Sequence, residues 1–217
     1  MKIISTNIGE PRILNWNGKE VETGIFKYPV SQPIYLGSED VENDHVIDRR
    51  YHGGLDKACY LYSSDHYEYW KKLYPDLEMP WGMFGENLTV SGLNESDIHI
   101  GDIYQVGEAI VQVSQPRQPC FKLGVRFGNQ KVVDDFWLLP FPGVYVRVLQ
   151  FGNVKKGDEL ILLERNPECL SVSQVFSIFR VNRDKYDLIR KAIDEPLLAE
   201  SCRRDIQKIL DFNKNIG

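Results

Sequence analysis

Residues 102–122, DIYQVGEAIVQVSQPRQPCFK, carry the clearest structural signal of the chain. Within them, residues 103–106 and 109–113 alternate apolar with polar side chains, which is the pattern of strands with one buried face. Only Gly107 and Glu108 separate the two runs, and a two-residue connection that contains glycine is typical of a β-hairpin. The sequence therefore predicts a hairpin here, followed at once by a loop rich in proline.

Short β-branched runs separated by turn signals continue through the rest of residues 1–165, which is typical of a sheet or barrel protein. The strongest of these runs predicts a strand at 144–149, with residues 159–163 as its partner. Shorter strands are predicted at 3–4, 24–27, 58–61 and 87–90. The first 165 residues are therefore expected to form mainly β structure.

Helices are predicted at two places in this region and throughout the chain that follows it. Ser63 or Ser64 can cap a helix that runs to Leu73 before Pro75, and a second helix is predicted over about 130–139. After residue 165 the periodicity becomes helical. Three helices are predicted there, from Ser171 or Ser173 to Arg180, from Asp184 to Ala192, and from Pro196 to Phe212. The fold class is therefore mainly β with α, with one domain at 1–165 and a three-helix domain at 166–217.

Composition narrows the class of protein. A hydrophobic content of 42% and a charged content of 26% over 217 residues describe an ordinary soluble globular chain. The formal net charge of −5 lacks the broad basic field that nucleic-acid binding requires. No apolar run reaches the roughly 18 to 20 residues of a membrane span, and the first residues hold no secretory apolar region. We therefore expect a cytoplasmic protein with neither a nucleic-acid nor a membrane partner.

Four cysteines lie more than thirty residues apart, so no CxxC pair indicates a zinc site or an iron–sulfur cluster. Cys59, Cys169 and Cys202 are predicted to be small buried thiols. Cys120 differs because it lies between the basic residues Arg117 and Lys122 in a polar loop that two prolines stiffen. The neighbouring cations favour a thiolate, which is both a nucleophile and a ligand for soft metals.

Two further segments combine glycine with polar side chains. The sequence HGGLDK at 52–57 offers paired glycines, whose backbone can approach a ligand closely, beside the cationic His52 and Lys57. Its alternative interpretation is a simple Gly-Gly turn between strands. The sequence GEN at 85–87 contains Glu86, which could donate a proton or could bond the nearby backbone.

Together these segments resemble the MOSC domain, the module shared with molybdenum cofactor sulfurases. The resemblance rests on residues 52–57, 85–87, the IGD turn at 100–102, and QVSQPRQPCFK at 112–122. The last segment is highly specific, whereas the others are specific only in combination with it. Their order and the helical C-terminal region are most similar to the bacterial YiiM-type branch. The likeness covers essentially the whole chain and implies a β-barrel-like core followed by three helices.

The resemblance also implies a bound molybdenum cofactor, molybdopterin with its metal, and a set of residues that serve it. Cys120 would be the protein's metal ligand and a catalytic residue, together with Glu86 and His52. The implied cofactor contacts are Gly53, Gly54, Lys57, Asn87, Arg117, Lys122 and Arg147. One departure concerns Asn43-Asp44, which stand where the family usually has a Gly-Asp pair. Asn tolerates a left-handed backbone, so the turn can persist, while the role of Asp44 stays open.

Members of this group are similar to reductases that convert N-hydroxylated bases and amidoximes to amines. Because no second redox centre is visible, such an enzyme would need an external electron donor, for which a flavoprotein is expected. The alternative function is a carrier, in which Cys120 binds the cofactor or a sulfane sulfur and passes it on without turnover. A pyridoxal-phosphate-assisted sulfur protein is disfavoured, since the chain has no room for that domain. The enzyme and the carrier differ in whether a substrate cavity opens beside Cys120.

Overall fold

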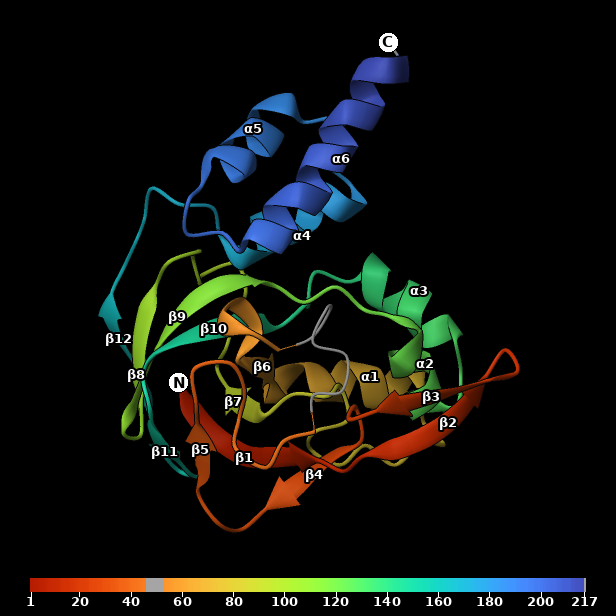
Figure 1. The fold of residues 1–217 in the computed structure, drawn as a ribbon, viewed down its shortest axis with the longest axis vertical. Coiled ribbons are helices and arrows are strands. Elements are labelled where there is room, and N and C mark those ends of the chain that lie inside the picture. The colour runs from red at the N-terminus through yellow and green to blue at the C-terminus, as the bar shows by residue number, and fades with distance from the viewer. Residues whose placement is uncertain (46–52, 217) are drawn as a thin grey trace.

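The computed structural model describes residues 1–45 and 53–216, and its centre is an eight-stranded sheet (Figure 1). The strands follow the order β12-β8-β9-β10-β6-β7-β1-β4. All neighbours in the sheet are antiparallel except β6 and β7, which are parallel. The strands are β1 (Lys2–Gly9), β4 (Lys27–Val30), β6 (Cys59–Ser63), β7 (Leu88–Ser91), β8 (Ile103–Val106), β9 (Ala109–Pro116), β10 (Val144–Gln150) and β12 (Leu160–Glu164).

The predicted hairpin is confirmed. β8 and β9 pair in antiparallel register from Val106 opposite Ala109 to Ile103 opposite Gln112. Gly107 in the connection has a φ of 55°, which is the left-handed backbone that such a tight turn requires. β9 continues three residues beyond the predicted end, to Pro116, so the proline loop begins directly from the sheet.

The predicted pairing of residues 144–149 with 159–163 is wrong. β10 lies between β9 and β6, so both of its edges are already paired, and β12 pairs with β8 instead. The sheet also curls until its two ends approach each other. Ile3 donates a backbone hydrogen bond to Asp158 at 2.9 Å, and Leu160 donates one to Met1 at 2.9 Å. The core is therefore barrel-like, although β12 and β4 remain the edge strands of the ladder.

Two small sheets accompany the main one, and neither was anticipated. β2 (Arg12–Trp16) and β3 (Lys19–Thr23) form a projecting hairpin, while β5 (Ile34–Leu36) pairs with β11 (Gly152–Val154) (Figure 1). The strand predicted at 24–27 is largely wrong, because β4 starts only at Lys27. The backbone carbonyl of His45 packs so closely on Gly24 that a side chain would not fit there.

Helical segments follow β6 and β9. Ser63 caps η2 (Ser64–His66), which continues into α1 (Tyr67–Leu73), as predicted. α3 (Lys131–Leu138) confirms the predicted helix at 130–139. η1 (Leu55–Lys57) precedes β6, and α2 (Phe121–Phe127) was not predicted. α1 and α3 contribute to an aromatic core that contains Tyr60, Tyr62, Trp70, Phe84 and Phe136.

The C-terminal region forms the three predicted helices, α4 (Val172–Arg180), α5 (Tyr186–Asp194) and α6 (Glu200–Ile216). Ser171 and Gln174 cap α4 reciprocally, because each side chain bonds the other's backbone N–H. The third helix starts four residues later than predicted. Pro196 lies in a turn closed by a hydrogen bond from the backbone N–H of Leu198 to the carbonyl of Glu195.

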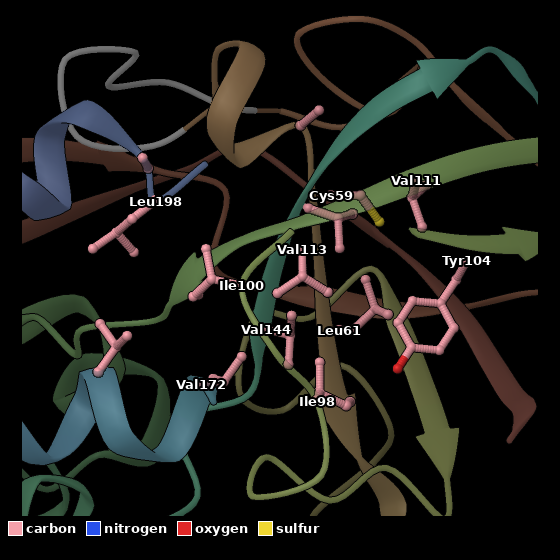
Figure 2. Close-up of a cluster of buried hydrophobic side chains, with 14 of the residues drawn as sticks. Cys59, Leu61, Ile98, Ile100, Tyr104, Val111, Val113, Val144, Val172 and Leu198 are labelled. Carbon is pink, nitrogen blue, oxygen red and sulfur yellow. The ribbon is translucent and has the colours of Figure 1, made fainter. Parts of the chain in front are cut away.

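One hydrophobic core joins these helices to the sheet. Val172 and Leu198 pack with residues of the sheet such as Cys59, Leu61 and Val113 (Figure 2). The predicted domain boundary at 165 stays a prediction, but apolar packing continues across it. None of the helices in residues 1–45 and 53–216 combines the length and apolarity needed to cross a bilayer.

Candidate functional site

Cys120 lies where the β9 strand gives way to helix α2. Its backbone is extended, with φ −133° and ψ 172°, and it is the residue that immediately precedes the first turn of α2. Its carbonyl accepts a hydrogen bond from the N–H of Leu123 at 2.9 Å. The side chain is partly exposed and borders two cavities, which share Lys57, Cys120, Lys122 and Tyr145. The thiol that the sequence predicts to be reactive therefore lies where the two cavities meet.

The first cavity is strongly cationic. Lys27, Lys57, Arg117 and Lys122 line it, and Asp44 is the one carboxylate among its described lining residues. Gly53, Gly85 and Asn87, which come from the predicted motifs, also line it. A concave site with clustered positive charge suits an anionic ligand.

Arg117 is 4% exposed, which is unusual for an arginine. Its guanidinium lies 5.3 Å from the ring centroids of both Tyr60 and Phe136. Burial opposes its charge, but nearby Tyr60, Tyr145 and Cys120 outweigh burial and hold the pKa of Arg117 above its ordinary value. Within the described part of the chain, its Nη1 atom has no hydrogen-bond partner. A buried donor in that state is destabilising unless a ligand bonds it.

Two tyrosines form a wall of this cavity. Tyr60 of β6 and Tyr145 of β10 are direct partners in the sheet, and their ring centroids lie 5.0 Å apart. The Tyr60 hydroxyl donates to the carbonyl of Pro142 at 2.8 Å. Burial raises the pKa of both phenols, so both are neutral near pH 7. Their positions follow from the sheet register, which the sequence alone does not specify.

A buried ion pair between Lys27 and Asp44 lies at the edge of the cavity. Asp44 also accepts hydrogen bonds from the Gly9 N–H at 2.8 Å and from Asn87 at 2.9 Å. Burial works against its charge, but Lys27 and these hydrogen bonds prevail, so the pKa of Asp44 is lowered. Asn43 has a φ of 63°, which confirms that Asn accommodates the left-handed turn. Asp44 therefore ties β1, β4 and the segment before β7 together, and Lys27 was missed because nothing local marks it.

The paired glycines both have positive φ, 74° at Gly53 and 80° at Gly54, which other residues rarely adopt. Gly53 lines the first cavity, and the Gly54 N–H bonds the carbonyl of Glu39 at 2.9 Å. His52 lies outside the described residues. Lys57, at the end of η1, lines both cavities. Burial lowers the pKa of its ammonium, and the carboxylates of Asp205 and Asp56 offset part of that effect.

Three predicted site residues in the described part of the chain, Gly54, Glu86 and Arg147, do not line either cavity. Glu86 is fully buried, and its carboxylate accepts from Tyr67, Thr89 and the N–H groups of Gly82 and Phe84, at 2.5 to 3.1 Å. Burial raises its pKa, and these hydrogen bonds oppose the rise. Its contacts hold the loop that carries Gly85.

Arg147 pairs with Asp56 through Nε and donates from Nη1 to the Leu197 carbonyl at 2.8 Å. Asp56 lies in η1 beside Lys57, and Leu197 lies just before α6. The structure therefore places Arg147 as a brace between the segment that carries Lys57 and the C-terminal helices.

The second cavity lies between the proline loop and helix α6. Gln115, Gln118, Pro119 and Phe121 line one side, while Ser201, Cys202 and Asp205 of α6 line the other. The helix is held there by a backbone hydrogen bond of 3.0 Å from Ala199 to Ser114. No α6 residue was predicted to belong to the site, because the contact joins segments some eighty residues apart.

The other cysteines are free and buried, as predicted. Burial raises the pKa of Cys59, Cys169 and Cys202 to about 12 in each case, and for Cys169 the Glu195 carboxylate adds to the effect. At neutral pH these three are therefore thiols. Of the four cysteines, Cys120 alone is partly exposed to solvent.

The proline loop, the paired glycines and the barrel-like sheet together define a MOSC domain, and the family model of that domain matches residues 48–161. The chain belongs to the MOSC domain family. It is 40% identical to protein YiiM of Escherichia coli over 205 residues, covering 89% of this chain and 90% of that protein. It is 39% identical to YflK of Bacillus subtilis over 211 residues, covering 96% and 94%.

Solved structures agree with this assignment. The fold superimposes on YiiM from Geobacillus stearothermophilus with a TM-score of 0.81 and 36% identity, over 96% of this chain and 98% of that one. YiiM from Escherichia coli gives a TM-score of 0.71, over 96% of this chain and 92% of that one.

A protein of Gibberella moniliformis named a reductase is 33% identical in sequence over 184 residues, which are 83% of this chain and 32% of that protein. The resemblance inferred from the motifs is thereby confirmed.

Proposed function

We propose that the protein binds the molybdenum cofactor in the first cavity and reduces N-hydroxylated compounds to amines. The observation that carries this proposal is the buried Nη1 atom of Arg117, which has no partner among the described residues and belongs to a cation-lined cavity beside Cys120. Membership of the MOSC family and the Gibberella relative named a reductase support the same function.

The residues present fit the cofactor's chemistry. The pterin carries a phosphate and several polar ring atoms, and the cavity offers Arg117, Lys27, Lys122 and Lys57 to them. A thiolate is the soft donor that molybdenum accepts, and Cys120 is the cysteine that the cavity exposes. Gly53 and Gly85 bring backbone to the cavity wall, and the missing side chain of Gly85 leaves space for Ile25, which also lines the cavity.

In this proposal Cys120 is the protein ligand of the metal, and Arg117 and Lys122 neutralise the anionic parts of the cofactor. Asn87 holds Asp44 in place, and Asp44 in turn fixes Lys27. The bound cofactor would supply a two-electron centre for removing oxygen from an N–OH group. The predicted roles of His52 in catalysis and of Gly54 in cofactor binding remain proposals.

Lys57 would supply a proton in this proposal. It lines both cavities, and burial lowers its pKa, so its ammonium is a better acid than that of an exposed lysine. Reduction of an amidoxime consumes two electrons and two protons and releases an amidine and water. Lys57 Nζ would hold one of those protons beside the reacting N–OH group.

The second cavity supports an enzyme over a carrier. A carrier needs only an exposed Cys120, whereas an enzyme needs a separate space beside it, and the second cavity borders that residue. Electrons would come from a separate protein, and we propose a flavoprotein. A cytoplasmic location also remains a proposal.

The test uses cofactor-loaded protein with reduced viologen as the electron source and benzamidoxime or N-hydroxyadenine as substrate. Chromatography should detect the amidine or amine in amounts well above those formed by the Cys120→Ser protein. A loaded protein that forms no product from either substrate, yet transfers cofactor to an apo-acceptor, would favour the carrier function.

A further inference from the structure

The second cavity has one wall that the MOSC core does not supply. Ser201, Cys202 and Asp205 all come from α6, and the opposite wall is the proline loop with Pro119 and Phe121. The Ser201 hydroxyl donates to Gln115 at 3.2 Å, which fixes the helix against β9. The cavity is therefore a slot between a helix and the Cys120 loop, with apolar atoms of Pro119 and Phe121 on one side.

Charge is distributed unevenly along this slot. Lys57 and Lys122 lie at the end shared with the first cavity, while Asp205 is the one carboxylate among the described residues that line the slot. Asp205 and Lys57 border the same cavity, and the Asp205 carboxylate opposes the lowering of the Lys57 pKa by burial.

The Asp205 carboxylate is available to a ligand. Its structural partner is Lys208, one turn further along α6, with Nζ 2.7 Å from Oδ1. The side chain of Lys208 is 77% exposed and that of Asp205 is 42% exposed, and such solvent-exposed ion pairs are weak. A ligand cation that excludes water from the slot can therefore compete with Lys208 for the carboxylate.

We propose that Asp205 determines substrate specificity by binding the two nitrogen atoms of an amidine-type group in the second cavity. This inference rests on the proposed function for its enzymatic meaning, and the binding site itself stands independently of the cofactor. In an amidoxime one carbon carries both an amino group and the N–OH nitrogen, and reduction converts this unit into an amidine. Asp205 would accept a hydrogen bond from the amino group of the amidoxime, and from both nitrogen atoms once the amidinium forms, so that the N–OH oxygen faces Lys57 and Cys120 at the other end of the slot.

The chemistry favours this orientation. An amidoxime is neutral near pH 7, whereas the amidine formed by reduction takes up a further proton and becomes a planar cation. A carboxylate pairs with such a cation through two parallel N–H···O hydrogen bonds. Asp205 therefore binds more strongly as positive charge develops, and it repels anionic substrates such as ionised hydroxamates. Pro119 and Phe121 provide an apolar surface for an aromatic ring attached to the N–C–N unit.

The first experiment measures binding by the purified chain without cofactor, so its outcome does not depend on the proposed reaction. Benzamidine and its neutral isostere benzamide are titrated into the wild type, Asp205→Asn and the control Asp211→Asn by calorimetry or ligand-observed NMR. Asp211 lies on the same helix but is exposed and bonds Gln207 at 2.8 Å. We expect Asp205→Asn to weaken benzamidine binding by about tenfold or more, because a charge-assisted pair is lost. Benzamide binding, and both affinities of Asp211→Asn, should be unchanged.

Two results would overturn the inference. One is equal benzamidine affinity for the wild type and a folded Asp205→Asn protein, with folding checked by circular dichroism. The other is the absence of benzamidine binding to the wild type. In loaded enzyme the same substitution should lower kcat/KM for benzamidoxime while leaving that for an oxime without the amino group nearly unchanged. If the protein holds no molybdenum but binds benzamidine through Asp205, the proposed reaction fails and the binding site remains.

Discussion

The guanidinium of Arg117 lies over the ring of Tyr60, 5.3 Å from its centroid, in a position where only 4% of the arginine is exposed. Arg117 follows the last residue of β9, and Tyr60 belongs to β6. The strand between them, β10, contributes Tyr145 to the same wall. Three strands and the proline loop therefore hold the charged guanidinium of Arg117 at the cavity.

This relationship predicts that Arg117→Met changes the stability of the protein little but strongly reduces its retention of the cofactor. In protein without cofactor the substitution removes an unsatisfied N–H as well as a cation–π contact, so the free energy of unfolding should change by no more than about 1 kcal/mol. Cofactor retention after gel filtration should fall strongly. Arg117→Lys should recover only part of it, since lysine lacks the planar fork. A large loss of stability with unchanged retention would show that Arg117 only braces the loop.

Cysteine chemistry gives a second prediction. With pKa values of about 12, Cys59, Cys169 and Cys202 are thiolate to only about one part in ten thousand at pH 8, and they are buried. Iodoacetamide should therefore modify Cys120 first in the native protein, and all four cysteines after denaturation. Peptide mass spectrometry at timed intervals measures the order. Labelling of Cys202 as fast as Cys120 would contradict the burial of α6 against the sheet.

The Lys27–Asp44 pair predicts a pH-dependent loss of stability on substitution. Because the folded pKa of Asp44 is lowered, its contribution is present above the unfolded value of about 3.9 and is lost as pH falls through the folded pKa. Asp44→Asn should thus reduce the free energy of unfolding by about 3 kcal/mol at pH 7, since it leaves Lys27 buried without its partner. Urea titrations from pH 7 to pH 3 should show the two proteins converging below about pH 4. A difference independent of pH would refute the charge pairing.

Glu86 provides a test of an assignment made from the sequence. Its carboxylate accepts two backbone N–H groups and two hydroxyls in a fully buried setting. In Glu86→Gln the NH2 group of the new side chain faces donor groups that it cannot accept from. The free energy of unfolding should therefore fall by about 3 kcal/mol. If Glu86 is structural, the folded fraction of the variant should retain cofactor and turn over normally. Normal stability combined with lost turnover would instead support the predicted catalytic role.

The sequence was informative where the signal is local. The hairpin at 103–113 and the cap at Ser171 each depend on residues close together, and both are confirmed. Cys120 could be separated from the other cysteines for the same reason, because its neighbours in sequence are also its neighbours in space.

Features that depend on long-range register could not be predicted. Residues 159–163 follow a turn after β10, which suggests a hairpin, yet β6 already occupies that edge of β10. Lys27, Tyr145 and Asp205 join the site only through sheet order and the docking of α6. Glu86 was predicted as a site residue because it lies within the GEN segment, and Arg147 because the resemblance implied cations around the cofactor. Their side chains are directed to structural partners.

The central claim is that Cys120 and the cation-lined cavity hold the molybdenum cofactor. The most direct test is the molybdenum and pterin content of the wild type, Cys120→Ser and the matched control Cys59→Ser, all expressed in a host that makes the cofactor. We predict molybdenum and pterin in equal amounts in the wild type and in Cys59→Ser, and strongly reduced molybdenum in Cys120→Ser. Absence of both from the wild type, or undiminished molybdenum in Cys120→Ser, would contradict the account.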